Sequence, residues 1–141
     1  MNRRTGSRLA TVLAATALAA GVSQAPAGAT PWPVDGVSTS GCVEADGQYE
    51  YEKTGEPDRY TASYWISVST TGRCSGSVGG HLRIRYKEWL GSFWETHDWE
   101  TIASTRGDGV GSDTLIEVKD VRFLVCDSTA SRPNYNCSYV S

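Results

Sequence analysis

Tryptophan and arginine are the residues of this chain best suited to binding chemistry. Trp89 and Trp94 fall on one face of a predicted hairpin with Arg83 and Arg85, and Trp65 falls on a strand face otherwise made of serine and threonine. Exposed tryptophan beside arginine is typical of protein-binding hot spots, because a flat, rigid ring buries much area at little entropic cost. The pattern favours recognition of another extracellular protein. The alternative is that a second sheet covers these rings as core.

Trp65 also favours a second class of ligand. Thr61, Ser63 and Ser67 share its strand face. Sugars stack their C–H faces on aromatic rings, and neighbouring polar side chains bind the sugar hydroxyls. A carbohydrate is therefore the alternative ligand, although such residues are equally ordinary on a solvated strand.

Two glutamates offer the best candidate for catalysis. Glu88 and Glu95 face each other in the predicted hairpin, with His97 diagonal to Glu88. Two opposed carboxylates are unfavourable unless a cation or a shared proton relieves them, and an acid pair is the machinery of a small secreted glycoside hydrolase. The alternative is a solvated pair near the hairpin tip. The sequence has no G-x-S-x-G, H-E-x-x-H or phosphate-loop motif, so we expect no enzyme, no metal site and no cofactor.

The four cysteines indicate two disulfides. They are Cys42, Cys74, Cys126 and Cys137, and their spacing lacks the short C-x-x-C pairs of a zinc site. Three connectivities are open, and we favour Cys42–Cys74 with Cys126–Cys137, because both pairs would join neighbouring strands.

The elements that must position these residues are strands. From Tyr60 to Ser69 apolar and polar residues alternate strictly, which places Tyr60, Ala62, Tyr64, Ile66 and Val68 on a core face. Further strands are predicted over 48–53, 81–89, 94–103, 114–126 and 135–140, with a bulge near Lys119-Asp120.

Residues 81–103 predict a hairpin around Gly91-Ser92, a pair that suits a two-residue turn with glycine first. In that register Trp89 opposes Trp94, Arg85 opposes Asp98 and Arg83 opposes Glu100. On the other face Leu82, Ile84 and Tyr86 oppose Thr101, Trp99 and His97.

These patterns predict an all-β domain over residues 42–141. Six or seven antiparallel strands pack most naturally as a two-sheet sandwich, immunoglobulin-like or similar, stapled by the two disulfides. A small barrel is the alternative.

Residues 1–29 predict a secretory signal. Arg3, Arg4 and Arg8 precede an Ala-rich apolar run, and Ala27-Gly28-Ala29 offers a cleavage site. Removing the signal leaves ten basic side chains against sixteen acidic ones, a formal net charge of −6. We therefore expect a secreted, extracellular protein that binds neither nucleic acid nor membrane.

Residues 30–41 form a separate, Pro-flanked extended segment around Trp32 with no evident strand partner in the chain. Such an arm could dock by adding itself as a strand to another protein. The alternative is a frayed terminus.

In general character, with its Ala-rich leader, paired cysteines and many aromatics, the chain resembles small secreted β-proteins of actinomycetes. One such group is the α-amylase inhibitors, two-disulfide sandwiches with a Trp-Arg-Tyr triplet. That triplet is absent here, because Trp65 is flanked by Tyr64 and Ile66. Another is the small adaptor subunit of secreted toxin particles. The resemblance implies an inhibitor or adaptor role and assigns no individual residue.

Overall fold

The computed structural model describes residues 30–141, so the predicted signal over 1–29 lies outside it. The described chain is all-β and antiparallel, as predicted. Its seven strands are β1 (Trp32–Val37), β2 (Val43–Lys53), β3 (Tyr60–Thr70), β4 (Gly79–Trp89), β5 (Trp94–Ser104), β6 (Val110–Ser128) and β7 (Tyr135–Val140). Within residues 30–141 no helix is long and apolar enough to cross a membrane.

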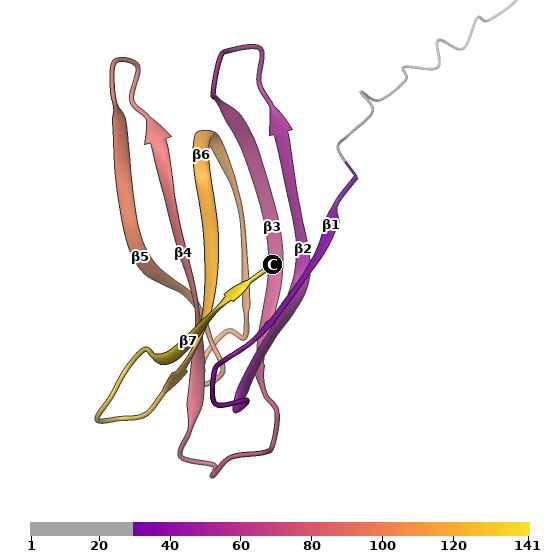
Figure 1. Cartoon of the computed structure of the whole chain (residues 1–141), viewed down its shortest axis with the longest axis vertical. Helices are drawn as coiled ribbons and strands as arrows, with labels where there is room; N and C mark the ends of the chain where they lie inside the picture. Colours follow the sequence, from indigo (N-terminus) through magenta and orange to yellow (C-terminus); the bar gives the residue numbers. More distant parts are fainter. Residues whose placement is uncertain (1–29) are drawn as a thin grey trace, which may run out of the picture.

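One long strand, β6, joins the two halves of the sheet. Its first part pairs with β3, from Val110 opposite Ser67 to Val118 opposite Tyr60. Its second part pairs with β4, and β7 pairs with that same part. In Figure 1 β6 rises, bends over between the β2–β3 and β4–β5 hairpins and descends. The strand order is β1-β2-β3-β6-β4-β5, with β7 beside β6.

The core lies between these two halves. One buried cluster joins β3, β4 and β6. Its members include side chains that are at most 1 % exposed, namely Ile66, Leu82, Ile84 and Val125. Phe123 of β6 packs edge-on against aromatic rings of β2 and β3. A sheet folded over a shared core in this way is consistent with the predicted sandwich.

The alternation predicted for β3 is confirmed. Ala62, Tyr64, Ile66 and Val68 are buried, whereas Trp65 between them is exposed. The irregularity predicted near Lys119-Asp120 is confirmed too, because the pairing of β4 with β6 shifts there. Asp120 takes a left-handed backbone conformation (φ 56°) at that shift.

Both predicted disulfides are present. Cys42–Cys74 joins the segment before β2 to the loop between β3 and β4, and Cys126–Cys137 joins β6 to β7. None of the cysteines in the described part of the chain is free.

The expectation that the segment around Trp32 has no strand partner in the chain is wrong. Residues Trp32–Val37 form β1 and pair with β2 in full register, from Trp32 opposite Tyr49 to Val37 opposite Glu44. Asp35 also exchanges two backbone hydrogen bonds with Ser141. Prolines that flank the segment conceal its strand character in the sequence, yet an edge position tolerates proline.

The hairpin register is confirmed only near its turn. Trp89 opposes Trp94 and Glu88 opposes Glu95, with Gly91 at φ 87° in the turn. Further along, two register shifts place Thr101 rather than Glu100 opposite Arg83, and Glu100 rather than Trp99 opposite Ile84. Ala103 rather than Thr101 lies opposite Leu82. Each bulge inserts a residue that the turn geometry cannot anticipate.

Candidate binding site

Trp65 stands at the centre of an outward-facing surface. Its side chain is 54 % exposed, because alternation along β3 directs it away from the core. Gln48 of β2 lies directly opposite it on one side, and Ser112 of β6 lies opposite it on the other. We call the outward residues of β1, β2, β3 and the first part of β6 the Trp65 face.

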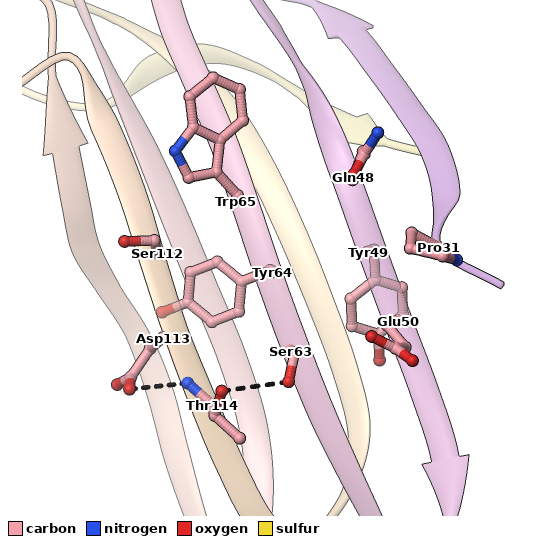
Figure 2. Close-up of a pocket in the computed structure, with 10 residues that line it drawn as sticks. All are labelled: Pro31, Gln48, Tyr49, Glu50, Ser63, Tyr64, Trp65, Ser112, Asp113 and Thr114. Atoms are coloured by element: carbon pink, nitrogen blue, oxygen red, sulfur yellow. Dashed lines mark hydrogen bonds between the residues drawn. The ribbon is translucent and has the colours of Figure 1, made fainter. Parts of the chain in front are cut away.

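Two hollows flank the indole. One, of ≈ 520 Å³, lies toward Ser63 and Glu50 (Figure 2). The other, of ≈ 530 Å³, lies toward Asp35 and Asp46. Trp65 lines both, so a ligand that crosses the ring reaches a hollow on either side.

Hydrogen bonds hold the polar side chains of this face in place. Ser63 and Thr114 share a hydroxyl hydrogen bond of 3.1 Å across β3 and β6, and the Thr114 N–H donates to Asp113 at 2.7 Å (Figure 2). On the other side of Trp65, the Ser67 hydroxyl donates to Asp46 Oδ1 at 3.0 Å. The face is therefore partly preorganised, which lowers the entropy lost on binding a polar ligand.

Tyr64 lies behind this face and contributes to the core. Burial raises its pKa to about 12, and the nearby carboxylates of Asp113 and Glu100 act in the same direction. The phenol therefore remains protonated at physiological pH and can donate a hydrogen bond.

The Trp89–Trp94 pair forms a second aromatic cluster. The two ring centroids are 5.4 Å apart, and both side chains are partly buried. The Arg59 guanidinium lies 4.7 Å from the Trp89 ring, and the Lys119 ammonium lies 4.0 Å from the Trp94 ring. Cations thus cover part of the surface that the sequence analysis assigned to a partner.

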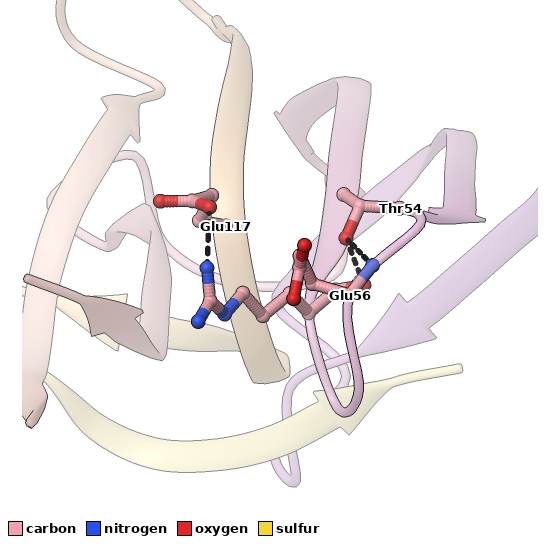
Figure 3. Close-up of polar contacts among 4 residues, drawn as sticks. Thr54, Glu56 and Glu117 are labelled. Carbon is pink, nitrogen blue, oxygen red and sulfur yellow. Dashed lines mark hydrogen bonds and ion pairs between the residues drawn. The ribbon is translucent and has the colours of Figure 1, made fainter. Parts of the chain in front are cut away.

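Arg59 also connects this cluster to the turn between β2 and β3. It forms an ion pair with Glu117 of β6, with Nη1 and Oε1 2.9 Å apart (Figure 3). In the same turn the Thr54 hydroxyl accepts a hydrogen bond from the Glu56 N–H at 3.3 Å. The ends of both hairpins and the bend of β6 are therefore joined to one another.

The two arginines of β4 differ in their surroundings. Arg85 is exposed, and its Nε lies 3.9 Å from Asp98 Oδ1, so the two side chains meet although the register shift leaves them unpaired in the strand ladder. Arg83 donates to the backbone carbonyl of Trp99, and its Nε is buried without a hydrogen-bond partner. Arg85 is consequently the better placed of the two to meet a ligand.

Glu88, Glu95 and His97 come together as the sequence predicts. His97 Nε2 lies 2.9 Å from Glu88 and 3.9 Å from Glu95. Their ligand atoms lie within 4.8 Å of one another, so the three side chains could hold a metal ion. None of the three lines either hollow beside Trp65.

The predicted binding residues fall into three places. Trp65 is separated from the Trp89–Trp94 pair by β6 in the strand order, so these three rings do not make one surface. Trp32 is 71 % exposed and borders a mostly apolar groove of ≈ 350 Å³. That groove is lined by residues of β1, β2, β6 and β7 that include Val34, Tyr49, Phe123 and Tyr139.

Sequence reasoning found the serines and threonine that share the strand face of Trp65 but missed its neighbours on the adjacent strands. Glu44, Asp46, Gln48 and Glu50 alternate with inward residues along β2, and this period-two pattern was the available signal. It was obscured because Gly47 interrupts the apolar positions, and the strand was expected to begin only at Gln48.

Comparison of the chain with protein-family models, with curated proteins and with solved structures found no match. The site must therefore be interpreted from its own chemistry.

Proposed function

We propose that this chain is a secreted, non-enzymatic binding module whose Trp65 face recognises a carbohydrate chain. The observation that carries the proposal is the position of Trp65. An exposed indole lies between two hollows, with hydrogen-bonding side chains directly opposite it on both neighbouring strands.

The geometry suits a sugar polymer for physical reasons. A pyranose presents a C–H face that packs on an aromatic ring, and its hydroxyls require donors and acceptors around the edge of that ring. Gln48 supplies both kinds of group, while Ser63 and Ser112 supply hydroxyls. An open face admits a long chain whose ends continue beyond the protein. The two disulfides are consistent with a function outside the cell, because disulfides persist in an oxidising environment.

The proposal is tested by binding to a glycan array and to insoluble polysaccharides. We expect saturable binding by the mature chain, and a loss of about 30-fold in affinity for Trp65→Ala, the effect of removing a hot-spot aromatic of about 2 kcal/mol. Phe93→Ala is the matched control, because Phe93 is a similarly exposed aromatic (56 %) outside the Trp65 face. No glycan bound, or full binding by Trp65→Ala, would refute the proposal.

A second candidate function is recognition of another protein by the end of the β4–β5 hairpin. Leu90 and Phe93 are 45 % and 56 % exposed there, next to the Trp89–Trp94 pair. Exposed apolar residues beside aromatic rings and arginine are typical of interface hot spots. Affinity capture from the culture medium, with Leu90→Ser/Phe93→Ser as the comparison, tests it. A protein captured by the native chain and lost with the double variant supports this function, and equal capture by both excludes the hairpin end.

A further inference from the structure

Carboxylates dominate the Trp65 face. Along β2 the outward positions carry four acids around Gln48, which are Glu44, Asp46, Glu50 and Glu52. Asp35 of β1 lies opposite Asp46 and adds a fifth. In β1, β2, β3 and residues 110–117 the only lysine or arginine is Lys53, at the last position of β2. On these strands the acids of this face therefore have no cationic neighbour except Lys53, at the far end of β2.

The central strands of the other half of the sheet carry cations together with the acids Glu88, Asp120 and Asp127. Arg83, Arg85 and Lys87 alternate on β4, and Lys119 and Arg122 lie on the second part of β6. If the acidity were a property of the whole surface, lysine and arginine would be distributed evenly between the two halves of the sheet. The concentration of acids around Trp65 is thus a local property of that face, beyond the net charge of the protein.

The carboxylates reach the two hollows beside the indole. Glu50 and Asp113 line one hollow, and Asp35 and Asp46 line the other. Asp46 accepts a hydrogen bond from the Ser67 hydroxyl, which holds this carboxylate on the outward surface. A carboxylate accepts about four hydrogen bonds, so ample capacity remains for a ligand.

We infer that the carbohydrate bound by this face is a cationic amino-sugar polymer, a chain of hexosamine units with free amines. The inference rests on the proposed function and names its ligand class. Trp65 offers a stacking platform to one sugar ring of the chain and attracts cations through its π face. Carboxylates in both hollows attract protonated amines on the units before and after the stacked one. An anionic glycan would be repelled by the same groups.

The test compares a glucosamine hexamer with the matched N-acetylglucosamine hexamer by titration calorimetry. The buffer is mildly acidic, so that the free amines carry a proton. We expect the glucosamine hexamer to bind about tenfold more tightly or better, and that advantage to shrink as salt screens the charges. Affinity for the neutral hexamer should be independent of salt.

Charge-removing variants locate the effect. Asp46→Asn/Glu50→Gln should lower affinity for the glucosamine hexamer about tenfold more than affinity for the neutral hexamer, because only the glucosamine hexamer carries amines that the two carboxylates attract. Asp98→Asn is the matched control, because Asp98 is a highly exposed acid on β5, away from the Trp65 face. A hexalysine peptide, which has charge without sugar rings, should bind weakly.

The outcomes separate this inference from the proposed function. Equal affinity for the two hexamers, or a preference unaffected by Asp46→Asn/Glu50→Gln, overturns the cationic ligand and leaves carbohydrate binding intact. Tight binding of hexalysine overturns it as well, since charge alone would then suffice. Failure of both hexamers and of every array glycan removes the proposed function, and the inference with it.

Discussion

Gln48 of β2 lies directly opposite Trp65 of β3 in the antiparallel register, on the exposed surface of the sheet. A side-chain amide beside an exposed indole can hydrogen-bond the hydroxyls of a sugar stacked on the ring. Gln48→Ala should therefore weaken glycan binding about fivefold, the value of one net hydrogen bond of about 1 kcal/mol. Titration with the best array ligand measures this loss, and the melting temperature should stay unchanged because Gln48 is exposed. Unaltered affinity would mean that the amide does not contact the sugar.

The close approach of β2 to β3 beneath Trp65 depends on Gly47. A Cβ at this position would lie 2.1 Å from the Trp65 carbonyl oxygen and 2.6 Å from the Ile66 Cα, and both of these are backbone atoms. Gly47→Ala should lower the free energy of unfolding by about 3 kcal/mol and weaken glycan binding, because β2 must move away from Trp65. Urea denaturation measures the first effect.

Gly55→Ala is the matched control for that substitution, since nothing lies within 4 Å of a Cβ there. It should leave both stability and binding near the native values. If Gly47→Ala were as stable as Gly55→Ala, the register of β2 on β3 would be wrong.

The sequence predicted the alternation within single strands better than it predicted the pairing between distant strands. The ten residues from Tyr60 to Ser69 alternate without a break, so the two faces of β3 follow from the sequence alone. The turn at Gly91 set the hairpin register as far as Tyr86, and a bulge then shifted it. A bulge depends on what packs against both strands, which short-range patterns do not contain.

The candidate site was predicted only in part for the same reason. Trp65 was identified from its strand face, but Gln48 and Ser112 became its neighbours through pairings across β2 and β6. The position of Asp35 beside Asp46 required β1 to pair with β2, which the prolines concealed. Residues distant in the chain meet because strands pair, and one sequence does not determine which strands do so.

The Cys126–Cys137 disulfide fixes β7 to the second part of β6, on the other half of the sheet from Trp65. Cys126→Ala/Cys137→Ala should lower the free energy of unfolding by about 3 kcal/mol, because the short loop between them regains its entropy in the unfolded chain. Glycan binding at temperatures well below unfolding should persist, since Cys126 lies in the second part of β6 and Cys137 in β7, outside the Trp65 face. Urea denaturation and array binding of the same preparation check both statements. Lost binding by a folded variant would contradict the assignment of the site to the Trp65 face.

Asp127 at the end of β6 is a buried carboxylate, 1 % exposed, that connects three segments. Its Oδ2 accepts hydrogen bonds from the Ser40 hydroxyl at 2.5 Å and from the Asn136 amide at 3.0 Å. Burial raises the pKa of Asp127. Hydrogen bonds from Ser38, Ser40 and Asn136 lower it, and because their combined effect is the larger one, the pKa is below its usual value. The folded state therefore favours the charged form.

A lowered folded-state pKa gives stability that is present above the unfolded pKa of about 3.9 and disappears as the pH falls through the folded value. Asp127→Asn should cost roughly 2 kcal/mol at neutral pH, because an uncharged amide replaces a carboxylate whose Oδ2 accepts hydrogen bonds from Ser40 and Asn136. The difference from the native chain should narrow below about pH 4, where Asp127 of the unfolded native chain begins to be protonated while the folded carboxylate still keeps its charge. Urea denaturation across this pH range measures the difference, and the exposed Asp98→Asn is the control, expected to change stability little. If the difference in the free energy of unfolding between the two chains stayed constant down to the lowest pH measured, the charge of Asp127 would add nothing to stability.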